Sequence, residues 1–235
     1  MNELLLLITA LVSALFVLAG WKFGKERLYS VIIVFLILIA AVGAKIVFFF
    51  GHPTNTGNIF YASVFLATYF LIERFGKREG LYSIGVGIVA VVFFSALIQI
   101  TIALTGSPAT APINNALATA FGPISRVTLA SLCAYALSQS LNVYLYLVLK
   151  ERMQGKYLWL RANICNALAQ LLDSTVFFLI AFIGLVPPAD IWEIIFTGLF
   201  IKIVYMMVAS PLLYFNRVEE EQDSRGDFMV TLKWR

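Results

Sequence analysis

Histidine and cysteine, the residues that most often carry metal and nucleophilic chemistry, are almost missing from this sequence. It contains one histidine, His52, and two cysteines, Cys133 and Cys165. A metal site or a nucleophile with its base needs several such side chains close together, and no nucleotide-binding glycine loop, HExxH or CxxC motif occurs. We therefore expect no metal, no cofactor and no catalytic residues, and we interpret both cysteines as core thiols.

Charge is scarce as well. Charged residues make up 13% of the chain and hydrophobic residues 61%, whereas soluble domains carry about 25% and about 45–50%. A water-soluble fold of 235 residues has no room to hide this much apolar surface. The composition predicts a multi-pass helical protein of a lipid bilayer. Its net charge of +4 suits loops that meet anionic lipid, so no nucleic-acid partner is expected.

Seven apolar stretches approach the length of about 20 helical residues that crosses a bilayer. They fall at residues 3–20, 30–50, 59–73, 81–104, 124–149, 162–184 and 191–215. The third is short, and we expect its flanking Phe60, Tyr61 and Phe75 to extend it into the interface. The first is not preceded by basic residues, so we interpret it as a retained helix and not as a signal peptide.

Basic residues predict the orientation. All lysines and arginines except Lys45, Arg126 and Lys202 lie in alternate loops and the tail, at residues 21–29, 74–80, 150–161 and 216–235. No lysine or arginine lies in the other loops, at residues 51–58, 105–123 and 185–190. The positive-inside rule therefore predicts an all-α bundle of about seven spans, with the N-terminus outside and the C-terminus inside. Whether loop 105–123 forms a re-entrant segment or a lid stays open.

Four ionisable residues lie within the predicted spans. Asp173 and Lys202 lie near the middle of spans six and seven, too deep for their charges to reach the interface. Lys45 and Arg126 lie nearer the outer ends of spans two and five, where a long side chain can extend to the headgroups. Ionisable groups at bilayer depth usually face the bundle interior and act there. Asp173 and Lys202 are therefore the first candidates for a site.

Amides and hydroxyls form two stripes on the neighbouring spans five and six. The stripes are Ser131, Tyr135, Ser138 and Asn142, with Gln139 beside them, and Asn163, Asn166, Gln170 and Asp173. Spacings of three and four residues put each set on one helical face. Hydrogen bonding between helices explains one or two such groups, but two facing stripes that include a carboxylate favour a solvated pocket.

The stripes also contain a short internal repeat. Residues 136–142 and 167–173 both read Ala-Leu-x-Gln-x-Leu, followed by Asn or Asp. Because spans five and six run in opposite directions, the two copies are related by inverted topology. Many transporters build a substrate site near the membrane midplane from inverted repeats.

The side chains of such a pocket suit a flat heterocycle. Gln139, Asn142 and Gln170 supply both donors and acceptors, whereas an ionised Asp173 only accepts. Flat apolar faces for stacking come from four aromatic residues, Tyr135, Tyr144, Phe177 and Phe178. This mixture favours a purine-like base with amide-like edges over an aliphatic lipid.

Four stretches of the sequence carry a resemblance to a known family. They are Phe65 to Thr68 with Glu73 to Lys77; Arg126, Ala130, Ser131, Ala134 to Ala136, Gln139 and Asn142; Trp159 to Arg161 with Gln170, Asp173 and Phe177 to Phe182; and Lys202 with Pro211. Together they resemble the queuosine precursor transporters, also called the vitamin uptake transporter family, over residues 31–215. The resemblance implies a prokaryotic inner-membrane importer of 7-deazaguanine-type bases used in tRNA modification.

The resemblance also implies what is unusual here. Family members carry acidic residues where this sequence has Tyr69 and Asn142, so Asp173 remains as the carboxylate at depth and Glu73 lies at the inner boundary. Substrate identity and proton coupling therefore stay open. Relatives have six predicted spans, so we expect an extra N-terminal helix with its loop, a transporter bundle and a cytoplasmic tail, at residues 1–29, 30–215 and 216–235.

We predict an importer with a midplane pocket between spans five, six and seven, in which Lys202 keeps Asp173 ionised and Asp173 accepts from the ligand edge. The expected substrate contacts are Ser131, Tyr135, Gln139, Asn142, Asn166, Gln170, Asp173 and Phe177. The expected supporting or gating charges are Lys45, Glu73, Arg126 and Lys202. The nearest rival is a substrate-capture subunit that docks onto an ATP-driven module through small residues such as Ala10 and Ala14. An intramembrane enzyme is disfavoured, and the oligomeric state and any energising partner stay open.

Overall fold

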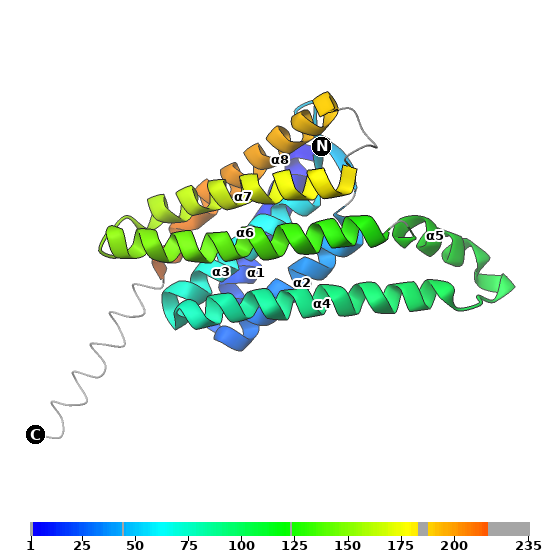
Figure 1. Ribbon diagram of the computed structural model, residues 1–235, viewed down its shortest axis with the longest axis horizontal. Coiled ribbons are helices and arrows are strands. Elements are labelled where there is room, and N and C mark those ends of the chain that lie inside the picture. The colour runs from blue at the N-terminus through cyan, green and yellow to red at the C-terminus, as the bar shows by residue number, and fades with distance from the viewer. Residues whose placement is uncertain (1, 44, 123, 183–187, 216–235) are drawn as a thin grey trace, which may run out of the picture.

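The chain forms a helical bundle with one short β-hairpin (Figure 1). The computed structural model describes residues 2–43, 45–122, 124–182 and 188–215. Its α-helices are α1 (Asn2–Lys22), α2 (Lys25–Val42), α3 (Gly57–Phe75), α4 (Lys77–Ala103), α5 (Ala111–Phe121), α6 (Ile124–Arg152), α7 (Leu158–Phe182) and α8 (Pro188–Ala209). Two 3-10 helices, η1 (Pro108–Thr110) and η2 (Ser210–Tyr214), and two strands, β1 (Ile46–Phe49) and β2 (His52–Asn55), complete the described elements.

The predicted all-α membrane bundle is confirmed. Within the described ranges, every α-helix except α5 has at least 18 residues. Five helical segments are both long and apolar enough to cross a membrane, namely α1, α4, Leu129–Arg152 of α6, Leu158–Ala181 of α7 and Ile195–Tyr214. α2 and α3 are not among them. α2 opens with the charged Lys25, Glu26 and Arg27, and α3 contains Asn58, Thr68, Glu73 and Arg74, which lower its hydropathy.

One end of the bundle gathers the basic turns, and we call it the basic end. The α1–α2 and α3–α4 turns lie there at Gly24 and Gly76, which adopt φ of 98° and 87°. Such positive φ values favour glycine, because a side chain would clash with the backbone. The α6–α7 turn lies at the same end (Figure 1). The positive-inside rule predicts that this end faces the cytoplasm.

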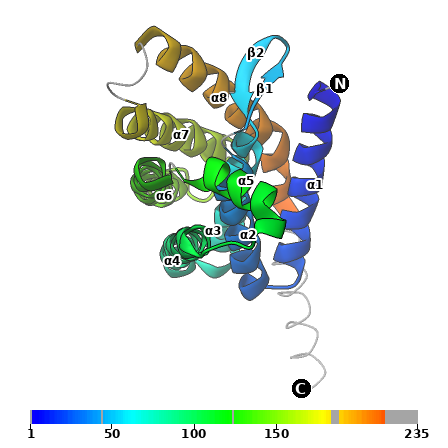
Figure 2. The same ribbon diagram turned by 90° about the vertical axis from the view of Figure 1, so that its right-hand side faces the viewer.

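α3 occupies the centre of the bundle (Figure 2). All of its residues from Ile59 to Ile72 are buried except Phe60, and the helix contacts α1, α2, α4, α8 and η2. Because protein surrounds it on every side, α3 can carry hydroxyl groups that lipid would penalise. The expectation that Tyr61 lies in the membrane interface was wrong, since Tyr61 is buried among these helices.

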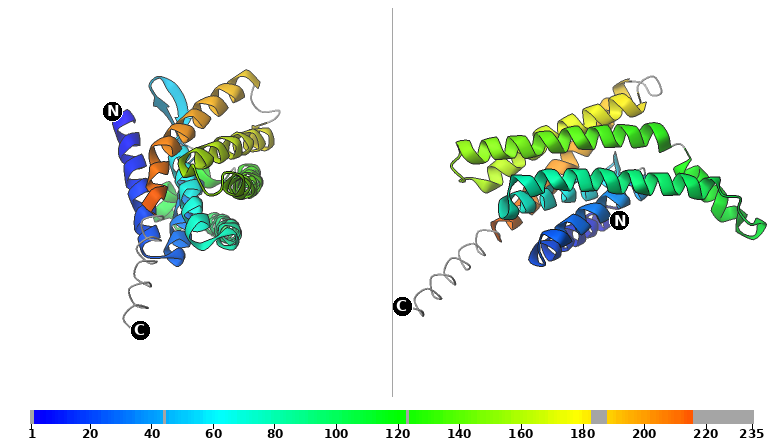
Figure 3. Two further views of the ribbon diagram at one scale, coloured as in Figure 1. Left: turned by 90° about the vertical axis from the view of Figure 1, so that its left-hand side faces the viewer. Right: turned by 60° about the horizontal axis from the view of Figure 1, so that its bottom comes forward.

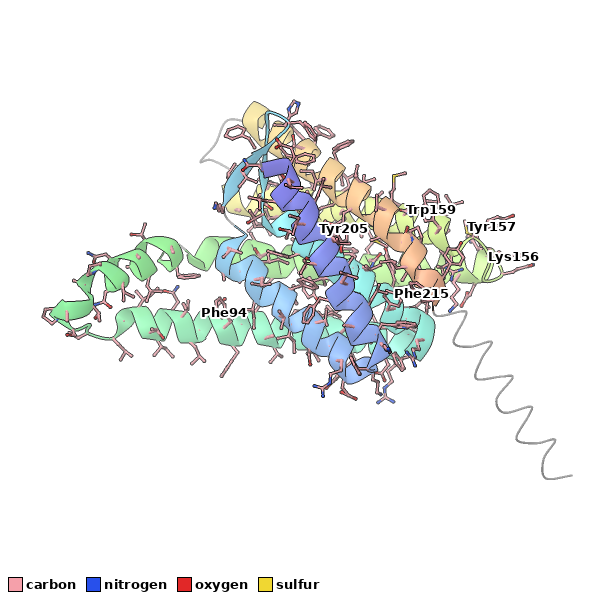
Figure 4. All side chains as sticks on the ribbon, turned by 180° about the vertical axis from the view of Figure 1, so that it is seen from behind. Phe94, Lys156, Tyr157, Trp159, Tyr205 and Phe215 are labelled. Carbon is pink, nitrogen blue, oxygen red and sulfur yellow. The ribbon has the colours of Figure 1, made fainter. Side chains whose placement is uncertain are left out.

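α6 and α7 form an antiparallel helical hairpin and have the most extensive contact of any two elements. The connection adopts positive φ at Gln154, Gly155 and Tyr157. Arg161 closes it by donating from Nη1 to the carbonyls of Gly155 and Lys156, at 2.8 and 3.0 Å. Figure 4 labels Lys156, Tyr157 and Trp159 at this tip. The hairpin therefore places the two predicted stripes side by side.

The second span is shorter than predicted. α2 ends at Val42, and residues 46–55 form the β1–β2 hairpin instead of more helix. The two-residue loop, Phe50 and Gly51, has φ of 48° and 83°, and positive φ at both loop positions is typical of a type I′ hairpin turn. The preceding Ile-Val-Phe-Phe run also suits a strand, since β-branched and aromatic residues favour extended backbone. Lys45 therefore lies outside any helix and is exposed.

The long outer loop contains a helix. α5 folds back beside the far end of α4, which runs past the rest of the bundle (Figure 3). Phe94 and Phe121 meet edge-to-face with centroids 6.3 Å apart, and Gln99 Nε2 donates to the Phe121 carbonyl at 2.8 Å. Figure 4 shows Phe94 on the side of α4 that faces α5. No residue of α5 is buried, so the helix lies on the outside of the bundle.

α1 packs along one edge of the bundle (Figure 2). Ala10 packs against the core and Ala14 is half-buried, so these small residues contribute to packing inside the chain. Arg74 of α3 fixes the basic end of α1, donating from Nη1 to the Trp21 carbonyl at 3.1 Å with its guanidinium over the Trp21 ring. An apolar crevice of about 380 Å³ between α1 and α2, lined by Ile8, Val12, Phe35 and others, lies apart from the polar residues described below.

Two glycines of α4 give a direct test of how α4 packs against α2 and α6. A Cβ at Gly87 would lie 2.6 Å from Leu36 Cδ1 and 2.6 Å from the Tyr135 hydroxyl, whereas a Cβ at Gly85 meets nothing within 4 Å. We expect Gly87→Leu to lower the free energy of unfolding by about 1–3 kcal/mol, because overpacking forces neighbours apart. Gly85→Leu should be neutral or stabilising, since leucine is the better helix former. Thermal unfolding of both variants in detergent measures the difference, and equal midpoints would contradict the packing.

Candidate functional site

Asp173 joins four helices through its two carboxylate oxygens. Oδ1 accepts hydrogen bonds from Tyr61 Oη of α3 at 2.6 Å and from Ser138 Oγ of α6 at 3.3 Å. Oδ2 lies 3.3 Å from Lys202 Nζ of α8. Asp173 itself lies on α7, so α3, α6, α7 and α8 meet at one group. We call Tyr61, Ser138, Asp173 and Lys202 the Asp173 clasp.

Lys202 is held inside the bundle and does not extend to the membrane surface. The residue is 6% exposed and Asp173 is 8% exposed. The Lys202 ammonium also lies 4.8 Å from the centroid of the Tyr61 ring. This cation–π contact gains strength in a desolvated setting. The two deep charges singled out in the sequence are therefore direct partners, as the predicted pairing of Lys202 with Asp173 requires.

A second set of polar groups lies beside the clasp on α6 and α7. Gln139, Asn142, Asn166 and Gln170 are each 0% exposed, and we call them the amide cluster. Asn142 Nδ2 donates to Gln139 Oε1 at 3.4 Å. Gln139 Nε2 and both side-chain polar atoms of Asn166 and Gln170 make no hydrogen bond. A buried amide without a partner is costly, and five such atoms lie together in the neighbouring stripes of α6 and α7.

The internal repeat keeps the same burial in both copies. Gln139 and Gln170 occupy matching positions and are both buried, while Leu137 and Leu168 match and are 53% and 49% exposed. Each copy thus turns its amide inward and its leucine toward lipid. The predicted stripes are therefore interior faces of the α6–α7 hairpin, and they do not face lipid.

Tyr69 and Asn142, the two positions at which the family resemblance implied acidic residues, contact each other. Tyr69 Oη donates to Asn142 Oδ1 at 2.6 Å and lies 3.1 Å from the Ala162 carbonyl. The two departures therefore form one neutral hydrogen-bonded pair between α3 and α6. This pairing satisfies both side chains without a buried charge.

Charged residues gather nearer the basic end. Glu73 Oε1 of α3 lies 2.8 Å from Arg161 Nη2 and 3.2 Å from Lys150 Nζ. The Arg161 side chain is fully buried and that of Glu73 is 9% exposed, and the guanidinium lies 5.1 Å from the centroid of the Tyr146 ring. We call Glu73, Lys150 and Arg161 the inner ion cluster. Of these, sequence reasoning named only Glu73 as a supporting charge.

The other predicted site residues differ in how close they lie to the Asp173 clasp. Tyr135 is buried and contacts Tyr61 edge-to-face at 6.3 Å, while Ser131 and Phe177 are half-buried. Tyr144 is 64% exposed on α6, so the expectation that it lines the pocket was wrong. Asn163 of the predicted stripe donates to Ser210 Oγ and to the Trp159 carbonyl, each at 2.8 Å, and serves as a structural link.

The two charges expected near the outer ends of spans have different outcomes. Lys45 is exposed in the segment before β1, so its proposed place in a span was wrong. Arg126 lies in the first turn of α6, and its side chain is outside the part of the chain that the structure describes. Residues 216–235, the predicted cytoplasmic tail, also lie outside the described ranges.

Sequence reasoning named Glu73 of α3 as a supporting charge but missed that Tyr61 and Tyr69 belong to the site. Tyr61, Phe65, Tyr69 and Glu73 recur every four residues, and Tyr61, Tyr69 and Glu73 contact the α6–α7 hairpin. The spacing was visible in the sequence, but three of these residues are aromatic and do not stand out in a chain with 20 phenylalanines and 10 tyrosines. The site is therefore built by α3, α6, α7 and α8, and not by the last three spans alone.

The arrangement provides groups that can recognise a ligand. Among the described residues, no three His, Cys, Asp or Glu side chains gather in a way that could hold a metal ion, and both cysteines are free thiols. The amide cluster offers donors and acceptors next to a carboxylate whose oxygens already have partners. Such a site can bind and orient a ligand that presents its own donors and acceptors.

Comparison with known proteins points to transport. The profile of a family described as "Putative vitamin uptake transporter" matches residues 55–216, from the end of β2 to the end of the described bundle. A protein named "Probable queuosine precursor transporter" from Bacillus subtilis (strain 168) is 32% identical over 225 residues, which cover 92% of this chain and 95% of the relative. No solved structure matches the chain.

Proposed function

Because this chain belongs to the vitamin uptake transporter family, a multi-pass family of prokaryotic cell membranes, we propose that it imports a small flat heterocycle bound between α6, α7 and α3. The amide cluster supplies the contacts to the substrate. The most suitable substrate is a 7-deazaguanine-type base, a queuosine precursor of the kind that the name of the Bacillus subtilis relative indicates.

One observation carries the proposal. Five buried amide atoms of Gln139, Asn166 and Gln170 make no hydrogen bond, although buried polar groups in folded proteins are nearly always paired. Leaving them unpaired opposes folding, so their presence in the interior needs a purpose other than holding helices together. Asn166 and Gln170 each offer two N–H donors and a carbonyl acceptor, and Gln139 offers its N–H donors. A base with lactam and amine groups on one edge presents the complementary pattern.

Asp173 has a different role in this proposal from the one expected from the sequence. Its oxygens already accept from Tyr61 and Ser138 and pair with Lys202, so the carboxylate has little capacity left for a ligand. Asp173 instead positions α6 and α7 relative to α3 and α8, and the amides read the substrate. Tyr135, which contacts Tyr61 and has a hydroxyl without a partner, provides an aromatic face beside the cluster.

Ligand-dependent stabilisation of the purified protein tests this assignment. A 7-deazaguanine base at about 100 times its dissociation constant stabilises the folded state by about 2.7 kcal/mol, which corresponds to a rise in melting midpoint of roughly 5–10 °C for a chain of this size. Adenine, which lacks the lactam edge, is the matched control and should leave the midpoint unchanged. The same base should also accumulate in liposomes that contain this chain alone.

Two results would overturn parts of the proposal. If no 7-deazapurine or purine shifts the midpoint while another class of vitamin does, the substrate assignment is wrong. If the base binds but does not enter liposomes until an ATP-hydrolysing module is added, the chain is a substrate-capture subunit instead.

A further inference from the structure

The network of buried side chains continues from the amide cluster to the basic end of the bundle, and there it is sealed. We propose that the inner ion cluster and the Tyr69–Tyr146 pair above it form the inner gate of the transport path, and that the gate is closed in this structure. The inference rests on the proposed import function, because a gate has meaning only if a substrate passes. It assigns a role to Arg161, Lys150, Tyr69 and Tyr146 that recognition of the substrate does not require.

The layer of the gate nearest the basic end is the inner ion cluster, which joins α3, α6 and α7. Arg161 of α7 and Glu73 of α3 approach to 2.8 Å without the alignment of a hydrogen bond, and Lys150 of α6 reaches the same carboxylate oxygen at 3.2 Å. The arginine side chain is fully buried, while that of Lys150 is 36% exposed. Glu73 therefore ties α3 to both arms of the α6–α7 hairpin at the point where the path would open.

The second layer is aromatic and lies next to the ion pair. Tyr69 and Tyr146 stack with ring centroids 4.7 Å apart at 27°, and both are 0% exposed. Arg161 lies over one partner of this stack, Tyr146, so the charged and aromatic layers contact each other directly. Both layers join α3 to the α6–α7 hairpin, and separating α3 from the hairpin would open them together.

The exposed fractions of the side chains between the basic end and the Asp173 clasp also indicate a closed gate. The gate residues Tyr69, Tyr146 and Arg161 and all four members of the amide cluster are 0% exposed. Toward the opposite end, Asp173 and Tyr61 are each 8% exposed, and Ser131 and Phe177 are half-buried. The polar interior is therefore closed above the inner ion cluster, at the end that the positive-inside rule assigns to the cytoplasm, while the side chains of Glu73 and Lys150 at the outer edge of that cluster are 9% and 36% exposed.

Cys165 provides a natural reporter of this gate. It is 0% exposed and lies on α7 four residues after Arg161, so the two side chains occupy one face of the helix, one turn apart. Cys133 is half-buried on α6, and replacing it with serine leaves Cys165 as the sole thiol. A membrane-impermeant maleimide added to inside-out membrane vesicles then measures how often the gate opens toward the cytoplasmic face.

We expect Glu73→Gln to raise the rate of Cys165 labelling about tenfold, because breaking a buried ion pair strongly destabilises the arrangement that contains it. Glu79→Gln is the matched control. Glu79 pairs with Lys25 at 3.4 Å and accepts from Tyr29 at the same end of the bundle, but between α2 and α4. It should therefore leave the labelling rate of Cys165 unchanged, and right-side-out vesicles should show no effect of either variant.

The proposal is overturned if Glu73→Gln inserts and purifies normally yet labels as slowly as the parent, or if Glu79→Gln accelerates labelling equally, which would indicate general loosening. If Glu73→Gln does not fold, Lys150→Gln weakens the same cluster from its exposed side and should give a smaller increase; no increase would also overturn the gate. Labelling requires no substrate, so a failure of the gate is distinguishable from a failure of the proposed import, which the binding and uptake measurements decide.

Discussion

Lys202→Met is expected to be among the most destabilising single substitutions in this chain. It removes the cation that faces Asp173 at 3.3 Å and leaves a carboxylate in a site where only 8% of the residue is exposed. Removing one partner of a buried ion pair costs about 3–5 kcal/mol, because the remaining charge stays desolvated. Thermal unfolding and the yield of monodisperse protein in detergent measure the loss.

A second substitution shows whether the loss comes from the orphaned charge. Asp173→Asn in the Lys202→Met background removes that charge, while the amide that replaces the carboxylate keeps an oxygen that can accept from Tyr61 and Ser138. We expect the double variant to recover most of the stability, as replacing buried ion pairs by neutral groups is often tolerated. Such recovery, measured as a coupling energy in a double-mutant cycle, would establish the clasp as a structural link. Additive losses would show that Asp173 and Lys202 act separately.

Hydropathy and helical periodicity were sufficient to predict the bundle and the interior faces of α6 and α7. The amides at positions 139, 142, 166 and 170 stand out because lipid-facing helices avoid such groups, and their spacing fixes which face they share. The pairing of Asp173 with Lys202 followed from depth alone. Each of these predictions depends on residues that contrast with an apolar background.

The features that were not predicted depend on residues that do not stand out from the apolar background. The Ile46–Phe49 strand is a short apolar run, and periodicity does not separate such a run from the end of a buried helix. Tyr61 was expected in the interface because tyrosine is enriched there, whereas its partner, Asp173, is 112 positions away in the chain. The central place of α3 depends on how the other helices pack around it, which a single sequence does not state.

Gln170→Leu is expected to separate binding from stability in the amide cluster. Both polar atoms of the Gln170 side chain are buried without a hydrogen bond, so leucine, which has a similar volume, removes a desolvated amide and should leave the melting midpoint unchanged or raise it. Substrate affinity should fall by about tenfold to a hundredfold, the effect of losing hydrogen bonds worth about 1.5–3 kcal/mol. Calorimetric titration of the purified variant with the base measures this fall.

Asn163→Leu is the matched control, since it replaces an amide of the same helix whose Nδ2 already has partners, although its Oδ1 has none. Asn163 Nδ2 donates to Ser210 Oγ and to the Trp159 carbonyl, so its loss should lower the melting midpoint and leave affinity unchanged. Opposite responses from two amides seven residues apart on α7 are what a ligand site beside a structural link predicts. If Gln170→Leu instead destabilises the protein and keeps full affinity, the amide cluster is a packing feature and the substrate binds elsewhere.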